Sequence, residues 1–121
     1  MNTYHNTDKD IHLRIYKFII NCFNDVVKKI PSSPANIRII SQISGSLTSM
    51  GANDQEADGA GSKKDFIAKY VIVRKETKET LYWLCLIRDT TLVSEQEIHT
   101  YIVECEQILK IVSSIIQSAQ R

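Results

Sequence analysis

Four polar side chains near the middle of the chain have the types and spacing that could support acid–base chemistry. They recur three residues apart on two segments: Asn53, Glu56, Glu76 and Glu79. Two carboxylates held together can act as a general acid and a general base. The same groups can instead form a hydrogen-bonded device that sets register inside a helical bundle or between subunits. Because no nucleophile or evident pocket accompanies them, we favour the structural interpretation and assign them, with Ser49 and Trp83, to a polar packing or interface network.

The stretch GAGSKK, residues 59–64, combines glycines and lysines as a phosphate-binding loop does. In such a loop the lysine precedes the serine and a strand comes before the glycines, and neither holds here. A helix stop at the glycines, followed by a new helix capped by Ser62, explains the same residues.

The histidines lack the spacing of a metal site. A di-iron bundle needs Glu-x-x-His pairs on two helices, but Glu95 and His99 are four residues apart. His12 has only the aspartates of residues 8–10 nearby, and His5 lies in a polar tail. We therefore predict no catalytic residue, no metal site and no cofactor, with the histidines solvated.

The three cysteines, Cys22, Cys85 and Cys105, are far apart and each has apolar neighbours. Disulfide frameworks and zinc sites use closer pairs such as C-x-x-C. We interpret these residues as small buried hydrophobes in a reducing compartment.

A basic arc runs along residues 62–89, which hold seven basic and four acidic side chains. On a helical wheel its members lie within about 140° of one another: Lys63, Lys64, Arg74, Lys75, Lys78 and Arg88. Such an arc can contact the phosphates of a nucleic acid. Alternatively it is a solvated face on which Lys75 pairs with Glu79.

Apolar residues recur at three and four positions throughout the chain, which predicts helices and no strand. We expect a single all-α domain over residues 1–121, an antiparallel up-down-up-down four-helix bundle. The expected helices span residues 10–29, 34–58, 62–88 and 94–118. Their expected core is Ile15, Phe18, Cys22, Ile43, Leu47, Phe66, Val73, Leu84, Ile102, Cys105 and Val112.

Each expected helix begins at a residue that can cap it. Asp8 or Asp10 precedes the first helix, Ser33 with Pro34 opens the second, and Ser62 and Ser94 open the others. Short polar side chains at these positions accept hydrogen bonds from the first free backbone N–H groups.

The helix expected at 62–88 has more apolar surface than one bundle buries. Eight apolar residues lie outside the row that is expected to face the core: Ile67, Val71, Ile72, Leu81, Tyr82, Trp83, Cys85 and Leu86. A helix that is apolar nearly all round is buried on more than one side. Another copy of the bundle is the simplest cover, which predicts a closed homo-oligomer. The alternative is a monomer with some exposed apolar residues.

Composition limits the remaining classes of protein. The net charge is +1, so no global charge attracts the chain to nucleic acid or to an anionic membrane. No run approaches the roughly 18 apolar residues of a membrane span. The polar start, MNTYHNTDKD, is unlike a signal peptide. We expect a cytoplasmic protein with no membrane partner.

The middle of the chain resembles the four-helix-bundle family named for 23S rRNA intervening sequences, also called S23 ribosomal proteins. The stretches TSMGANDQEA, SKKDF and KETKETLYWL carry the resemblance, which covers roughly residues 10–118. It implies a homopentameric ring of four-helix bundles without known catalytic activity. Family members are encoded in extra segments of ribosomal RNA genes or elsewhere in bacterial chromosomes. A related accessory protein of diversity-generating retroelements is a cationic pentamer that works with a reverse transcriptase and nucleic acid.

This chain departs from the family pattern at three positions. Gly45 replaces a usual basic residue, Asp54 a common aromatic one, and Cys85 a frequent acid. The resemblance implies a non-enzymatic oligomer that engages RNA or a nucleic-acid-handling partner. The alternative is a protein–protein scaffold or assembly module without nucleic-acid contact.

Overall fold

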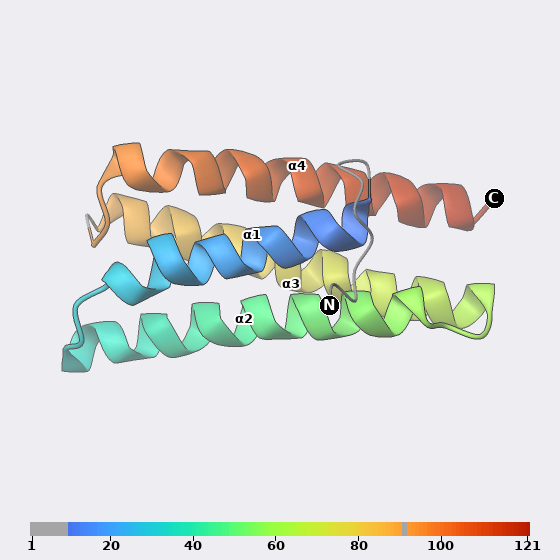
Figure 1. The fold of residues 1–121 in the computed structure, drawn as a ribbon, viewed down its shortest axis with the longest axis horizontal. Coiled ribbons are helices and arrows are strands. Elements are labelled where there is room, and N and C mark those ends of the chain that lie inside the picture. The colour runs from blue at the N-terminus through green and yellow to red at the C-terminus, as the bar shows by residue number, and fades with distance from the viewer. Residues whose placement is uncertain (1–9, 91) are drawn as a thin grey trace.

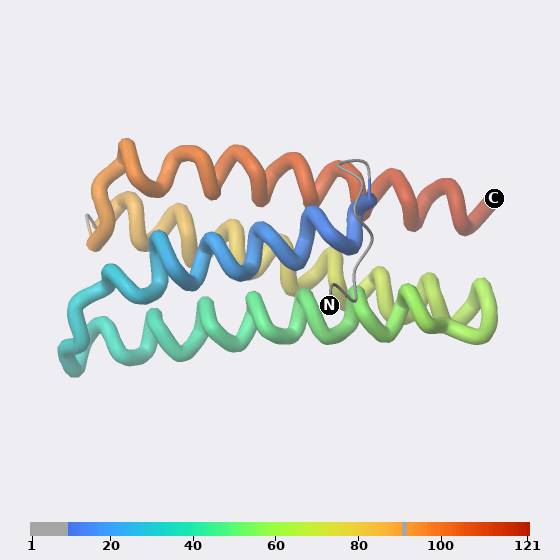
Figure 2. The backbone as a smooth tube through the Cα atoms, viewed as in Figure 1, coloured from blue at the N-terminus to red at the C-terminus, as the bar shows by residue number. Residues whose placement is uncertain are grey.

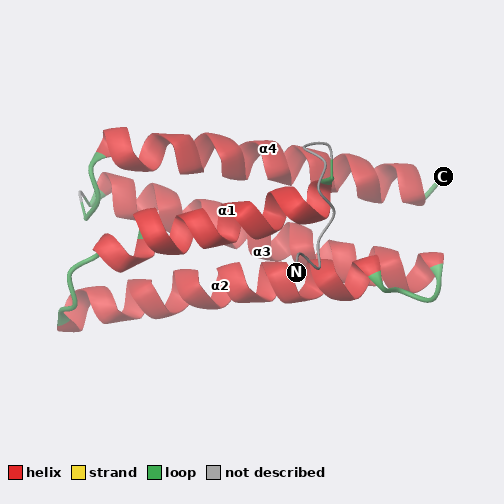
Figure 3. Cartoon of the chain, viewed as in Figure 1, coloured by secondary structure: helices red, strands yellow, loops and turns green. Residues whose placement is uncertain are grey.

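The protein is all-helical over residues 10–90 and 92–121, which are the residues that the computed structural model describes. Four helices form, α1 (Ile11–Asp25), α2 (Pro34–Asp58), α3 (Lys63–Asp89) and α4 (Glu95–Ala119), with a 3₁₀ turn η1 (Val27–Lys29) after α1. No strand occurs among the described residues (Figure 3), as predicted. The predicted positions of His5 and of the cap Asp8 lie outside them.

The four helices pack lengthwise as a helical bundle in which each contacts two others. α1 and α3 each pack against α2 and α4, and the α2–α3 contact is the most extensive. Figure 1 shows α1 lying beside only part of the length of the other three helices. The α2–α3 link lies at one end of the bundle, and the α1–α2 and α3–α4 links lie at the other (Figure 2).

The predicted caps explain where the helices begin. The Asp10 carboxylate accepts a hydrogen bond from the His12 backbone N–H at 2.8 Å. The hydroxyl oxygens of Ser33, Ser62 and Ser94 each accept from the backbone N–H three residues later. These bonds satisfy donors that have no partner inside the helix.

Helix α1 ends four residues before the expected position 29. Val26 leaves the helical region, with φ −120° and ψ −65°, and the chain continues as η1. Val26, Val27 and Ile30 are all buried. Ile30 is extended, with φ −74° and ψ 123°, because a residue that precedes a proline, here Pro31, is disfavoured in the helical region.

The core consists mostly of the residues that the sequence predicts to be buried. Ten of the eleven expected core residues are buried, and Phe66 is half-buried. The polar Ser46 is also buried and lies 2.8 Å from the Thr80 hydroxyl of α3. The apolar Ile37, near the start of α2, is 58% exposed.

Gly51 allows α1 to approach α2 closely. A Cβ atom at this position would lie 2.8 Å from Cδ1 of Ile19. The neighbour that Gly51 admits is therefore a side chain of α1. A Cβ at Gly45 would meet nothing within 4 Å, so the chain itself gives no packing reason for that glycine.

Candidate functional site

A groove of about 420 Å³ between α3 and α4 collects half of the basic arc. Its lining consists of Val71, Arg74, Lys75, Lys78, Leu109 and Ser113. Lys75 and Lys78 are exposed and Arg74 is half-buried, so three cationic groups surround a partly apolar floor. We call this hollow the α3–α4 groove.

The other half of the basic arc lies far from the α3–α4 groove. Lys63 and Lys64 begin α3 and Arg88 is near its end, so with a rise of about 1.5 Å per residue each lies at least about 15 Å along the axis from the nearest basic residue of the groove. Lys63 donates to the backbone carbonyl of Arg121 at 3.1 Å. Arg88 pairs with Asp89 at 2.8 Å. Only the central residues of the arc therefore form one basic surface.

The alternative interpretation of the arc required a Lys75–Glu79 ion pair. Within the described part of the chain, the ion pairs of α3 join Lys69 to Glu56 at 3.4 Å and Arg88 to Asp89. Lys75 therefore has no carboxylate partner within its own helix, and its charge is available to a ligand.

The members of the predicted polar network do not bond to one another across α2 and α3. Asn53 donates to the backbone carbonyl of Ser49 at 2.8 Å, one turn earlier in the same helix. Glu56 is exposed and pairs with Lys69. Glu76 and Glu79 are half-buried on α3. The hydroxyl contact between Ser46 and Thr80 makes the connection that these residues were expected to make.

Trp83, the remaining member of the predicted network, packs edge-on against Tyr82 with ring centroids 4.8 Å apart. Its indole Nε1 is buried and has no hydrogen-bond partner among the described residues. An unpaired buried donor costs about 1–3 kcal/mol. Trp83 therefore contributes through apolar contact and carries an unused donor on the face of α3 that has surplus apolar residues.

A buried polar cluster joins three helices at the start of α1. Nδ1 of His12 lies 2.8 Å from Oδ1 of Asp54, and Nε2 lies 3.2 Å from Oδ1 of Asp58. The Tyr70 hydroxyl of α3 donates to the same Asp54 oxygen at 2.7 Å. We call these four residues the His12 cluster. The expectation of a solvated His12 is wrong.

Electrostatics in the His12 cluster favour a protonated histidine. The hydrogen bond to Asp54 raises the pKa of His12 above 6.5, and the charges of Asp54, Asp58 and Asp10 act in the same direction against burial. Burial, reinforced by Asp54, strongly raises the pKa of Tyr70. Tyr70 therefore stays a neutral donor at any physiological pH.

The centre of the His12 cluster is enclosed. Asp54 is 2% exposed and Tyr70 is fully buried, whereas the His12 side chain is 16% exposed and Asp58, at the rim, is 37% exposed. A buried charge that is paired and hydrogen-bonded is a structural contact unless it opens. We therefore treat the cluster as a packing contact.

One sequence signal could have revealed the cluster. Asp54 continues the buried stripe of α2, four residues after Met50 and three before Ala57. A carboxylate on a buried stripe requires a donor from another helix. That the donors are His12 and Tyr70 could not be read from the sequence, because His12 is 42 residues away from Asp54.

The cysteines form no disulfide. Cys22 and Cys105 are buried, as predicted, and Cys85 is half-buried. Burial raises the pKa of Cys22 to about 12, and burial likewise raises the pKa of Cys105. Buried thiols with raised pKa values are poor nucleophiles because the thiolate is the reactive form.

Among the described residues, no group of three or more His, Cys, Asp or Glu side chains is placed to hold a metal ion. None of the helices in the same residues combines the length and apolar character needed to cross a membrane.

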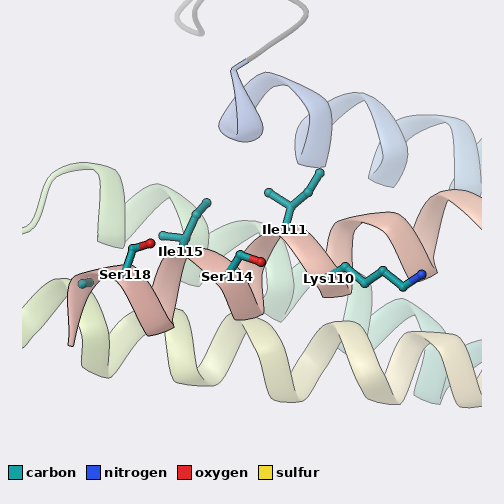
Figure 4. Close-up of a pocket in the computed structure, with 6 residues that line it drawn as sticks. Lys110, Ile111, Ser114, Ile115 and Ser118 are labelled. Carbon is teal, nitrogen blue, oxygen red and sulfur yellow. The ribbon is translucent and has the colours of Figure 1, made fainter. Parts of the chain in front are cut away.

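Two further hollows are lined by residues of α4. One, of about 570 Å³, lies along the last turns of α4 and includes Ile111 and Ile115. Figure 4 shows Ile111 pointing toward the start of α1. The other lies between α1 and α4, where Arg14 and Glu104 form a bidentate pair with both bonds 2.7 Å long.

Comparison with known proteins agrees with the resemblance seen in the sequence. The chain is similar to the crystal structure of a protein of unknown function from the S23 ribosomal protein family of Bacteroides thetaiotaomicron VPI-5482. The two share 32% identity with a TM-score of 0.80, covering 88% of this chain and 98% of that one. No curated protein matches the chain significantly. The family model for the 23S rRNA-intervening sequence protein matches residues 8–114. Because this is most of the chain, the protein belongs to that family.

Proposed function

We propose that the protein is a non-enzymatic, antiparallel up-down-up-down bundle that assembles into a closed homo-oligomer and binds RNA phosphates. The observation that carries the RNA proposal is the α3–α4 groove, where Arg74, Lys75 and Lys78 converge beside Ser113. Cationic side chains around a groove bind phosphates and release counterions. An oligomer repeats the groove in each subunit, so a weak single contact becomes a multivalent one.

Surplus apolar surface on α3 supports the assembly. Val71 is 38% exposed, Ile72 is 36% exposed and Tyr82 is 59% exposed in the single chain. A ring closes when such a patch meets a different patch on the next copy. The number of five subunits comes from the family resemblance and not from these exposures.

Light scattering coupled to gel filtration tests the assembly. We expect an oligomer, and we expect Tyr82→Glu to dissociate it by placing a charge in the apolar contact. Ile37→Glu is the matched control, since Ile37 is equally exposed but lies at the start of α2. A stable monomer at micromolar concentration would contradict the proposal. Dissociation by Ile37→Glu but not by Tyr82→Glu would show that the subunit interface is not on α3.

Binding of structured RNA at several salt concentrations tests the groove. The logarithm of the binding constant should fall by about 0.7 to 0.9 per phosphate contact per decade of salt. Arg74→Glu/Lys78→Glu should flatten that slope. Lys17→Glu/Lys28→Glu is the matched control, because it changes the net charge equally at exposed residues of α1 and the link after it. Equal loss in both variants would contradict groove binding.

The second candidate is a protein–protein scaffold without nucleic-acid contact. Val71 and Leu109 favour it, because they give the α3–α4 groove an apolar floor that a partner polypeptide could cover. The lysine stems beside them can pack on such a partner while their charges stay in water. Failure to bind RNA at low salt, with the oligomer intact, would favour this candidate.

The absence of enzyme activity is part of the proposal. It is supported by Glu56, whose carboxylate is exposed and paired with Lys69 instead of with a second acid. Glu56→Gln should alter stability or assembly. Turnover of any substrate that this variant loses while keeping its fold would overturn the proposal.

A further inference from the structure

His12 is held between two carboxylates on successive turns of α2. Its Nδ1 lies 2.8 Å from Asp54 and its Nε2 lies 3.2 Å from Asp58. A neutral imidazole has one N–H donor and one acceptor nitrogen, whereas an imidazolium has two donors. A neutral ring that carries its proton on Nδ1 keeps the hydrogen bond to Asp54 but turns a lone pair toward the negative Asp58. The protonated ring is attracted to both carboxylates.

We propose that the His12 cluster is a proton-dependent latch that fixes the first turn of α1 against the last turns of α2. The latch is closed while His12 carries two protons on its ring and opens when one of them leaves. This goes beyond the proposed function, since it concerns how one helix is attached to the rest of the bundle.

The other charged groups near His12 are accounted for on each neighbouring helix. Asp10 caps α1 and accepts the His12 backbone N–H, and Tyr70 of α3 donates to Asp54. On α4 the ionised group that bonds α1 is Glu104, which is held by Arg14. Within the described residues, the groups that face His12 are therefore carboxylates and a neutral phenol.

The position of the latch makes its opening local. Helix α1 is the shortest of the four, with 15 residues against 25 to 27 in the others. Its first turns bury Leu13 and Ile15, and elements with few contacts open below the global unfolding free energy. Loss of the latch therefore frees the start of α1 while α2, α3 and α4 stay packed.

The direction of the pH effect follows from the pKa of His12, which is raised above 6.5. A group with a raised folded-state pKa stabilises the closed form fully below its unfolded value. That stabilisation is lost as the pH rises through the folded value. Between the two values the opening constant increases about tenfold per pH unit.

Histidine ring NMR measures the latch directly. The His12 signal, identified by its loss in His12→Gln, should titrate above the reference value of about 6.5. Asp54→Asn should lower this pKa, and Asp58→Asn should lower it less, because Asp58 is 37% exposed and more distant. Titration of His12 at or below the reference value in the folded wild-type protein would overturn the proposal.

Hydrogen exchange of the amides of residues 15–18 measures opening. After correction for intrinsic rates, their protection should fall as the pH rises above 6.5 and then level off. In His12→Gln the protection should be low and independent of pH, with α3 amides unchanged in both proteins as the control. The same pH profile in wild type and His12→Gln would overturn the latch even if Asp54→Asn fails to fold.

Discussion

Two contacts made by α2 are built in different ways. Its contact with α3 is more extensive and mainly apolar, with the Ser46–Thr80 hydroxyl pair, the Tyr70–Asp54 hydrogen bond and an exposed Lys69–Glu56 ion pair beside the core residues. Its contact with α1 is smaller and includes the ionised His12 contacts with Asp54 and Asp58. Ordinary pH changes leave hydroxyl pairs and apolar burial intact, whereas an imidazolium–carboxylate contact depends on proton concentration.

The difference assigns separate roles to the two contacts. The mainly apolar α2–α3 pair is expected to be the stable part of the bundle, and α3 also carries the basic groove and the exposed apolar residues. The attachment of α1 is conditional. The following substitutions, ordered from the largest expected effect to the smallest, test whether stability divides in this way.

Leu84→Ala should destabilise the protein most, by about 3 kcal/mol, because it leaves a cavity at a fully buried position of α3. The loss should be the same at pH 6 and pH 9 in urea unfolding experiments, since no titrating group is involved. Leu81→Ala, at a half-buried position, is the control and should cost less. A strongly pH-dependent loss for Leu84→Ala would contradict the division.

Asp54→Ala should cost about 2 kcal/mol at pH 6, because it leaves the Tyr70 hydroxyl and the His12 ring without their acceptor. Above the raised pKa of His12 the ring is neutral, so the cost should be smaller at pH 9. Urea unfolding at both values measures the change, with Asp58→Ala as the more exposed control. A larger cost at pH 9 would show that the sign is wrong.

The Ser46–Thr80 contact should be worth about 1 kcal/mol, the net value of a typical buried hydrogen bond. A double-mutant cycle with Ser46→Ala and Thr80→Val isolates this coupling. Thr80 also donates to the Glu76 carbonyl at 2.9 Å, so the single substitutions include other losses. A coupling indistinguishable from zero would remove the hydroxyl pair as a reason for the α2–α3 register.

The smallest expected difference in stability is between alanine substitutions at the two glycines of α2. Gly45→Ala should stabilise the single chain by up to about 1 kcal/mol, because alanine is the better helix former and its Cβ meets nothing. Gly51→Ala should gain less, since Ile19 of α1 must move. Thermal unfolding of both variants measures the difference. Equal stabilisation would show that α1 adjusts freely, and destabilisation by Gly45→Ala in the oligomer would place that residue at a subunit contact.

The sequence predicted which residues have the right chemical type for the candidate site, but not which of them lie together. The six residues of the basic arc share one helical face, yet only Arg74, Lys75 and Lys78 line a groove with α4. A helical wheel discards distance along the axis, so it could not separate them from the ends of α3. The polar residues on α2 and α3 likewise share spacing, but Asn53 bonds within α2 and Glu56 pairs with Lys69 of α3.

The sequence by itself determined the four helices, their caps, most of the core and the family, because hydrophobic spacing, capping residues and motif residues are local properties of the chain. Only the tertiary structure decided that α1 stops at Asp25, that Ser46 faces Thr80 and that His12 is enclosed by Asp54, Asp58 and Tyr70. Each of these depends on which side chain from a distant segment fills or pairs with a given position. Such pairing is set by the packing of whole helices against one another. It therefore cannot be predicted from the periodicity within one helix.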